Sequence, residues 1–151
     1  MSRRIFIGAD HRGFKAKEAL LPTLKKLPDV EMVIDCGPIK YDENDDFNDP
    51  AILVCRNIVK DLDNNFGVLI CGSSFGVCIQ ANRFKQIRAV NPLDKERAKL
   101  GREHNNANVL CLSADQLKDD QLEAIVKEFF TTKYSGKERY ERRNQRLDKE
   151  I

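Results

Sequence analysis

Short apolar runs alternate with longer amphipathic segments along this chain, and the two kinds of segment predict different elements. The apolar runs are continuous, as expected for strands of a parallel sheet that is covered on both faces. They predict strands over residues 4–7, 30–34, 66–71, 88–90 and 108–112. Between them, apolar residues return at helical spacing, as at Leu20, Leu24 and Leu27, and again over 51–62 and 122–129. Strands that alternate with helices predict an α/β fold, a three-layer α/β/α sandwich around a five-stranded parallel sheet.

The C-terminal segment, about 137–151, breaks this pattern because it is a charged helix with few apolar residues. Such a helix cannot form a core of its own. Two interpretations stay open: a solvated tail, or a helix that lies across another surface such as a second subunit. Because no linker, repeat or low-complexity segment divides the chain, we expect residues 1–151 to form one domain.

Composition limits the class of protein. The 151 residues are 41% hydrophobic and 33% charged, which is ordinary for a globular protein, and a net charge of +2 does not predict nucleic-acid binding. No apolar segment has the length of a membrane helix or the form of a signal peptide, so we expect a cytoplasmic protein without a membrane partner. Five cysteines without a CxxC pair predict neither a disulfide framework nor a zinc site.

Polar residues gather directly after the predicted strands, where open parallel sheets bind ligands. The loop 8–13 after the first strand carries Asp10, His11 and Arg12 between glycines, although such loops are also common as plain turns. The two histidines of the chain, His11 and His104, both fall beside strand termini, on the presumed ligand side or its approach. This placement favours acid–base chemistry, because histidine titrates near neutral pH.

The third strand ends at Cys71, and a turn of small residues leads from it into a short predicted helix over 77–82. Free backbone N–H groups at such a helix start can hold an anion and favour a thiolate at Cys71. The alternative is a buried structural cysteine before a tight turn. The turn has neither a GxGxxG pattern nor the lysine of a P-loop. Scattered cysteines and two histidines lack the ligand spacing of zinc, so we expect no metal or other cofactor.

Four separated motifs, in order along nearly the whole chain, resemble ribose-5-phosphate isomerase type B and its galactose-6-phosphate isomerase relatives. They lie at residues 8–14, 68–83, 87–90 and 104–110. The resemblance implies a Rossmann-like domain that interconverts D-ribose 5-phosphate and D-ribulose 5-phosphate in the non-oxidative pentose phosphate pathway without a metal. It also implies a homodimer, or a tetramer, with active sites built from two subunits, which would give the C-terminal helix a surface to lie on.

The resemblance assigns chemical roles by position. Cys71 corresponds to the base that moves a proton between C2 and C1 through an enediolate. His104 corresponds to the residue that helps to open the furanose ring, with Ser73 as the small hydroxyl residue beside it. Preorganised N–H donors lower the barrier to an oxyanion intermediate. The family's anion hole corresponds to the backbone amides of Gly72, Ser73, Ser74, Phe75 and Gly76.

The remaining family positions correspond to substrate contacts. Asp10 and Asn105 match residues that bind sugar hydroxyls, and Asp46 matches a further acidic contact. A phosphate clamp corresponds to His11, Arg139 and Arg143. The two arginines are four residues apart, so on a helix they share one face and can bind one phosphate together. Otherwise, such a run of charges is usually a solvated helix face.

Three positions depart from the family pattern. Ser74 replaces a glycine, which would strain the turn if that position needs a positive φ. Phe47 lacks the hydroxyl of the family's tyrosine. Asp115 stands where an arginine commonly reaches the phosphate, and we expect Lys137, Arg142 or Arg12 to supply the missing charge.

Two other functions remain as alternatives to ribose 5-phosphate isomerisation. One is isomerisation of a hexose phosphate such as allose or galactose 6-phosphate, because Ser74 and Asp115 alter the substrate contacts. The other is a non-catalytic sugar-phosphate-binding subunit. The joint presence of Cys71, Ser73 and His104 favours an active enzyme over that subunit.

Overall fold

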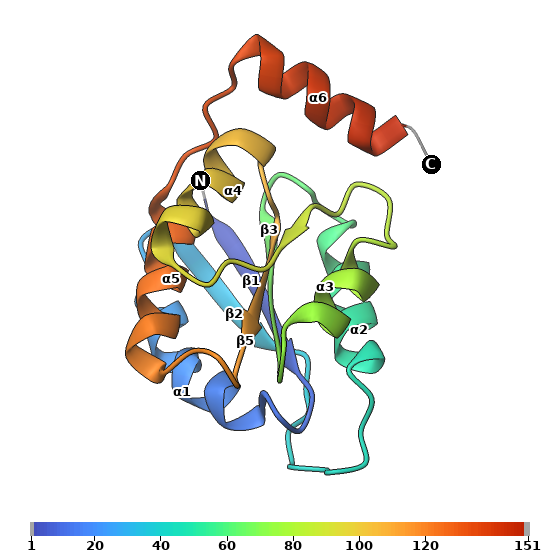
Figure 1. The fold of residues 1–151 in the computed structure, drawn as a ribbon, viewed down its shortest axis with the longest axis vertical. Helices are drawn as coiled ribbons and strands as arrows, with labels where there is room; N and C mark the ends of the chain where they lie inside the picture. The colour runs from blue at the N-terminus through green and yellow to red at the C-terminus, as the bar shows by residue number, and fades with distance from the viewer. Residues whose placement is uncertain (1, 150–151) are drawn as a thin grey trace.

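A computed structural model describes residues 2–149 and contains one sheet of five parallel strands in the order β2-β1-β3-β5-β4. All five predicted strands are confirmed, with bounds that differ by one or two residues. The strands are β1 (Arg3–Ala9), β2 (Val30–Asp35), β3 (Asn65–Cys71), β4 (Ala89–Val90) and β5 (Val109–Ser113). Figure 1 shows them side by side between two layers of helices, as the predicted α/β/α sandwich requires.

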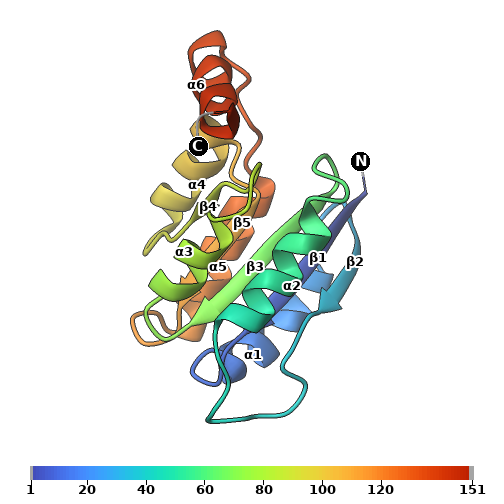
Figure 2. The same cartoon turned by 90° about the vertical axis from the view of Figure 1, so that its right-hand side faces the viewer.

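Six helices surround and extend this sheet. They are α1 (Phe14–Lys25), α2 (Asn48–Ile58), α3 (Phe75–Ala81), α4 (Lys95–Asn105), α5 (Asp119–Thr131) and α6 (Glu138–Lys149). Helices α2 and α3 cover one face of the sheet, and α1, α4 and α5 cover the other, as Figure 2 shows from the side. None of the helices within residues 2–149 is long and apolar enough to cross a membrane.

The apolar faces of the helices build one core cluster on each side of the sheet. On one side, Leu20 and Leu24 of α1 pack with Phe129 of α5. On the other, Val54 and Ile58 of α2 pack with residues of α3, β3 and β5. Because these side chains are almost fully buried, each contributes roughly 1.5–3 kcal/mol to the burial of apolar surface.

The two edge strands differ from the prediction that all strands are covered on both faces. Strands β3 and β5 are buried throughout, as predicted. Strand β2 is not, since Met32 is 50% exposed and none of its residues is fully buried. Strand β4 has only two residues, both half-buried. The prediction of full cover is therefore wrong at the edges of the sheet, where a strand has a neighbour on one side only.

Helix α6 lies beyond the sheet and touches the rest of the chain mainly through α4 (Figure 1). Its buried residue, Asn144, donates a hydrogen bond to the backbone oxygen of His104 at 3.0 Å. Asp148 pairs with Arg88 at 3.0 Å. The helix is thus attached to its own chain by polar contacts, while most of its surface remains exposed. The last two residues of the predicted segment, 150–151, lie outside the described residues.

Candidate active site

Three loops meet at the carboxyl edge of the sheet. They follow β1, β3 and β5, which are neighbours in the sheet, so the loops 10–13, 72–76 and 114–118 lie side by side at the lower end of the molecule in Figure 1. Glycine is required at the start of α1, because a Cβ on Gly13 would approach the backbone oxygen of Ile70 to 2.3 Å. This close crossing fixes the first loop against the end of β3.

Cys71 ends β3 at this edge, as predicted, and is buried. Its backbone oxygen accepts a hydrogen bond from the N–H of Ala114 at 2.9 Å, which ties it to the end of β5. Burial affects the pKa values of three other thiols. Burial raises the pKa of Cys36 to about 11 and that of Cys55 to about 12, and it raises the pKa of Cys111 as well. These three groups remain neutral thiols near pH 7.

The turn 72–76 is held from two sides. The backbone oxygen of Gly72 accepts hydrogen bonds from Ser113 Oγ at 2.6 Å and from the N–H of Asp115 at 3.0 Å. Ser74 has φ 71°, so the position does require the left-handed conformation and the expected strain is present. The N–H of Phe75 donates to Ser73 Oγ at 3.2 Å. Of the five amides assigned to the anion hole, that of Phe75 therefore already has an acceptor in this conformation.

Phe47 and Gly76 pack closely beside the turn. A Cβ on Gly76 would come within 2.9 Å of the Phe47 ring, so the glycine lets the aromatic side chain lie against the start of α3. The neighbouring Asp46 is exposed, and its backbone oxygen accepts from the N–H of Asp49 in the first turn of α2. Asp46 therefore lies at the rim of the carboxyl edge with a solvated carboxylate.

The loop after β1 holds Asp10 and His11 in different ways. Asp10 is buried, and its Oδ1 accepts from the N–H groups of Arg12 and Gly13, both at 3.0 Å. His11 is fixed by Asp45, whose Oδ1 accepts from the backbone N–H of His11 at 2.9 Å and lies 2.8 Å from its Nδ1. The ring of His11 is thereby oriented with Nδ1 toward the carboxylate, which leaves Nε2 for another partner.

A hollow of about 340 Å³ opens beside these loops. It is lined by the turn residues 73–75, by Asn91 and Leu93 after β4, and by Asp115 and Gln116 after β5. The lining residues carry hydroxyl, amide and carboxylate groups, and the volume is of the size that a small phosphorylated sugar requires. The predicted residues of α4 and α6, which are His104, Asn105, Arg139 and Arg143, are not among the residues that line this hollow.

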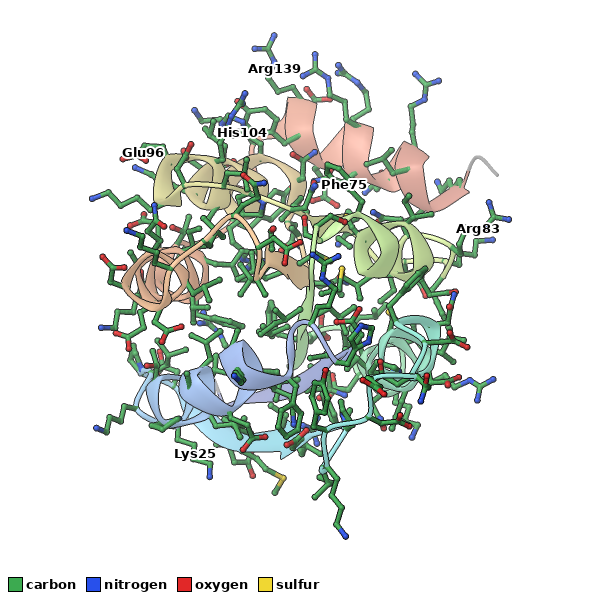
Figure 3. The ribbon with its side chains drawn as sticks, turned by 60° about the horizontal axis from the view of Figure 1, so that its bottom comes forward. Lys25, Phe75, Arg83, Glu96, His104 and Arg139 are labelled. Atoms are coloured by element: carbon green, nitrogen blue, oxygen red, sulfur yellow. The ribbon has the colours of Figure 1, made fainter. Side chains whose placement is uncertain are left out.

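His104 and Asn105 form the last turn of α4, at the amino edge of the sheet. The ring of His104 stacks on that of Tyr140 in α6, with centroids 4.3 Å apart and planes inclined by 18°. Arg139 and Arg143 are exposed on α6, as a phosphate clamp requires, and Figure 3 shows Arg139 and His104 at the same end of the molecule. The second group of predicted residues is therefore assembled by α4 and α6.

The two groups lie at opposite edges of the sheet. Cys71 is the last residue of β3, whereas His104 precedes β5, and the five residues of β5 span roughly 16 Å. The expectation that His11 and His104 share one edge is therefore wrong for a single chain. Its cause is the direction of α4, which runs from the carboxyl edge back to the amino edge, so that its last turn lies far from its first.

Sequence reasoning missed three residues that support these groups. Asp45 fixes His11, Tyr140 stacks on His104, and Asn144 binds the His104 backbone and Tyr134 Oη, the latter at 3.2 Å. Tyr140 and Asn144 could have been found from their four-residue spacing on a helix that is otherwise charged. Asp45 gave no such signal, because it lies in a loop without periodicity.

Among residues 2–149, no three His, Cys, Asp or Glu side chains are grouped in a way that could hold a metal ion. The carboxyl edge offers a thiol, backbone amides and a fixed imidazole, and the amino edge offers an exposed arginine pair. These groups are suited to proton transfer beside an oxyanion and to binding of a phosphate.

Nearly the whole chain is similar to known sugar-phosphate isomerases. Residues 5–147 match the family model described as Ribose/Galactose Isomerase. The chain is 39% identical to a probable ribose-5-phosphate isomerase B from Mycoplasma genitalium, over 100% of this chain and 95% of that protein. It is 33% identical to ribose-5-phosphate isomerase B from Mycobacterium tuberculosis, over 93% of this chain and 85% of that protein.

Solved structures show the same similarity. Ribose-5-phosphate isomerase B from Mycoplasma genitalium, solved with bound ribulose-5-phosphate, superposes with a TM-score of 0.92 and 38% identity, over 98% of this chain and 95% of that one. The type B ribose 5-phosphate isomerase of Trypanosoma brucei superposes with a TM-score of 0.91 and 33% identity, over 98% of each chain. Fold and sequence therefore place the chain in the same family.

Proposed function

Because the chain belongs to the ribose/galactose isomerase family, we propose that it is a ribose-5-phosphate isomerase, which interconverts D-ribose 5-phosphate and D-ribulose 5-phosphate. One observation carries the proposal. The chain superposes over 98% of its length, with a TM-score of 0.92, on an isomerase that holds ribulose-5-phosphate. The retention of Cys71, Ser73 and His104 supports an active enzyme rather than a non-catalytic subunit.

In the proposed reaction, Cys71 as a thiolate removes the proton from C2 of the open-chain aldose. The electron pair of the broken C–H bond forms a C1–C2 double bond, and negative charge moves to the C1 oxygen. Amides of the turn 72–76 stabilise this enediolate. The proton of the C2 hydroxyl passes to the C1 oxygen, and the Cys71 thiol returns its proton to C1, so that C2 becomes the ketone and C1 carries the new hydroxyl group. The base ends as a thiolate, so no external oxidant or reductant is needed.

We propose that the other half of each site comes from a second copy of the chain. His104, Asn105, Arg139 and Arg143 lie at the amino edge of the sheet, too far from Cys71 of the same chain to act on one small sugar. A two-fold dimer would bring the amino edge of one chain to the carboxyl edge of its partner, and it would form two identical sites. In this arrangement, His104 assists opening of the furanose ring, and the two arginines bind the phosphate.

Exposed apolar side chains support a homodimer. Phe75 and Ile79 of α3 are 62% and 66% exposed, and they are four residues apart on one helix face. Leu147 of α6 is also exposed. Contiguous exposed apolar side chains of this kind are typical of protein–protein contacts. The five free cysteines further support action in the cytoplasm, where thiols stay reduced.

The proposal is tested by an assay of ketose formation from D-ribose 5-phosphate. We expect turnover by the wild type, and we expect Cys71→Ala to lower kcat by about 10²–10⁴-fold, as loss of a general base does. The variant should fold normally, because Cys71 contributes little volume to the core. Cys78→Ala is the matched control, since it removes another thiol near the same sheet and should retain turnover.

The same assay with allose 6-phosphate and galactose 6-phosphate separates pentose from hexose specificity. Turnover of a hexose phosphate without turnover of ribose 5-phosphate would overturn the substrate assignment and keep the reaction class. Near-normal kcat in Cys71→Ala would instead show that another group is the base.

A further inference from the structure

Arg12 and Asp115 form an ion pair across the turn after Cys71. Arg12 comes from the loop after β1, and Asp115 comes from the loop after β5, so the pair bridges the two loops that flank the end of β3. A Cβ on Gly72 would lie 2.7 Å from Arg12 Nε and 3.0 Å from Asp115 Oδ2. The pair therefore lies directly over Gly72, next to the proposed base.

The carboxylate of Asp115 needs a cation at this place. Its backbone is fixed by the hydrogen bond from its N–H to the Gly72 oxygen, and its side chain lines the hollow beside Ser73 and Phe75. An unpaired carboxylate there would repel a phosphorylated substrate. Arg12 removes this repulsion, and one of its terminal nitrogens is sufficient for the contact with Asp115. A guanidinium has five N–H donors, so donors remain for an oxyanion.

The contribution of the pair to folding is too small to explain its position. Both side chains are about half exposed, at 57% and 40%, and exposed ion pairs contribute about 0–1 kcal/mol. Neither of the other basic residues considered for this charge lies at the carboxyl edge. Arg142 pairs with Glu138 at 3.0 Å on α6, and Lys137 directly precedes that helix.

We propose that Arg12 binds the phosphate monoester of the substrate and that Asp115 is a positioning residue, which holds the guanidinium over Gly72. This inference rests on the proposed isomerase function and adds a specificity determinant to the same site. Asp115 then has the opposite effect from the one that its charge alone suggests: it aids phosphate binding as long as Arg12 is present.

A double-mutant cycle tests both roles, with KM for ribose 5-phosphate and the inhibition constant of inorganic phosphate as readouts. Arg12→Met should raise both constants about tenfold to a hundredfold, the range for loss of a hydrogen bond to a charged group, and should lower kcat much less. Asp115→Asn should raise both constants in the presence of Arg12. In the Arg12→Met background it should lower them, because the remaining carboxylate only repels the phosphate.

The signs of these changes decide the proposal. If Arg12→Met leaves the inhibition constant of phosphate unchanged, Arg12 is not a phosphate ligand. If Asp115→Asn lowers KM in both backgrounds, Asp115 repels the phosphate and does not position the guanidinium of Arg12. Arg56→Met, which removes an exposed arginine of α2, is the matched control and should change neither constant.

Direct titration of inorganic phosphate into the wild type and Arg12→Met by calorimetry keeps this proposal separate from the proposed function. A wild type that binds phosphate through Arg12 but does not isomerise ribose 5-phosphate would contradict only the function. An active wild type with equal phosphate affinity in Arg12→Met would contradict only the role of Arg12.

Discussion

At the scale of single residues, Ser74 shows the clearest conflict between local preference and fold. Its φ of 71° is a conformation that costs a non-glycine residue about 1–2 kcal/mol. The side chain is buried, and its Oγ accepts a hydrogen bond from Asn91 at 3.4 Å, which is near the limit for such a bond. This strained residue lies in the turn that carries the proposed anion hole, where strain is often retained for function.

Ser74→Gly should raise the free energy of unfolding by about 0.5–1 kcal/mol, because relief of strain exceeds the added entropy of the unfolded chain. Chemical denaturation measures this change. Gln86→Gly is a matched control, since Gln86 also has a positive φ, 67°, but lies away from the turn. A loss of stability in Ser74→Gly beside a gain in Gln86→Gly would mean that the hydroxyl contact outweighs the strain.

The same scale shows what the sequence could predict. The position of Cys71 follows from the strand that it ends, and the strain at Ser74 follows from a family glycine at that place. The role of Asp45 could not be predicted, because the path of its loop depends on tertiary contacts. One of these contacts is made by the fully buried Lys17. Its Nζ donates to Asp35 at 2.6 Å and to the backbone oxygen of Pro38, which lies in the same connection as Asp45, at 2.8 Å.

At the scale of elements, α6 depends on a few polar contacts and on the stacking of Tyr140 on His104. Within its described residues, only Asn144 is buried, and this residue links the helix to the backbone of His104 and to Tyr134. An element with so little buried apolar surface belongs to the low-stability part of a fold. The sequence predicted this helix from its charged residues with high helix propensity, but it left the attachment open, since the spacing of Tyr140 and Asn144 marks a helix face without showing what that face contacts.

Asn144→Ala should loosen α6 without unfolding the sheet, because it removes both hydrogen bonds and leaves the His104 carbonyl without its donor. We expect faster amide hydrogen exchange over residues 138–149, a small shift in the global melting temperature, and a higher KM for ribose 5-phosphate. Gln145→Ala removes only a bond to Glu141 on the exposed side of the same helix and serves as the control. Equal exchange rates in the two variants would assign the docking of α6 to other contacts.

At the scale of the whole molecule, the central fact is the separation of the two residue groups by the length of the strands. The pattern of strands and helices was sufficient to predict the sandwich, because crossover connections leave few arrangements of a parallel sheet. The same pattern also places His104 opposite to Cys71, because a residue between a helix and the next parallel strand lies at the amino edge. It could not show the contacts of a second chain. The separation makes the oligomer a condition for activity in the proposed mechanism.

Complementation between two inactive variants tests this condition. Cys71→Ala and His104→Asn should each be impaired as homodimers, with the histidine variant affected more on furanose substrate than on an open-chain analogue. If each site takes Cys71 from one chain and His104 from the other, a mixed dimer has one site with both substitutions and one site with neither. Random exchange of subunits makes half of the dimers mixed, so refolding an equal mixture should restore about one quarter of wild-type activity. If both residues of a site came from one chain, every site in the mixture would lack one of them, and the activity would stay at the average of the two variants.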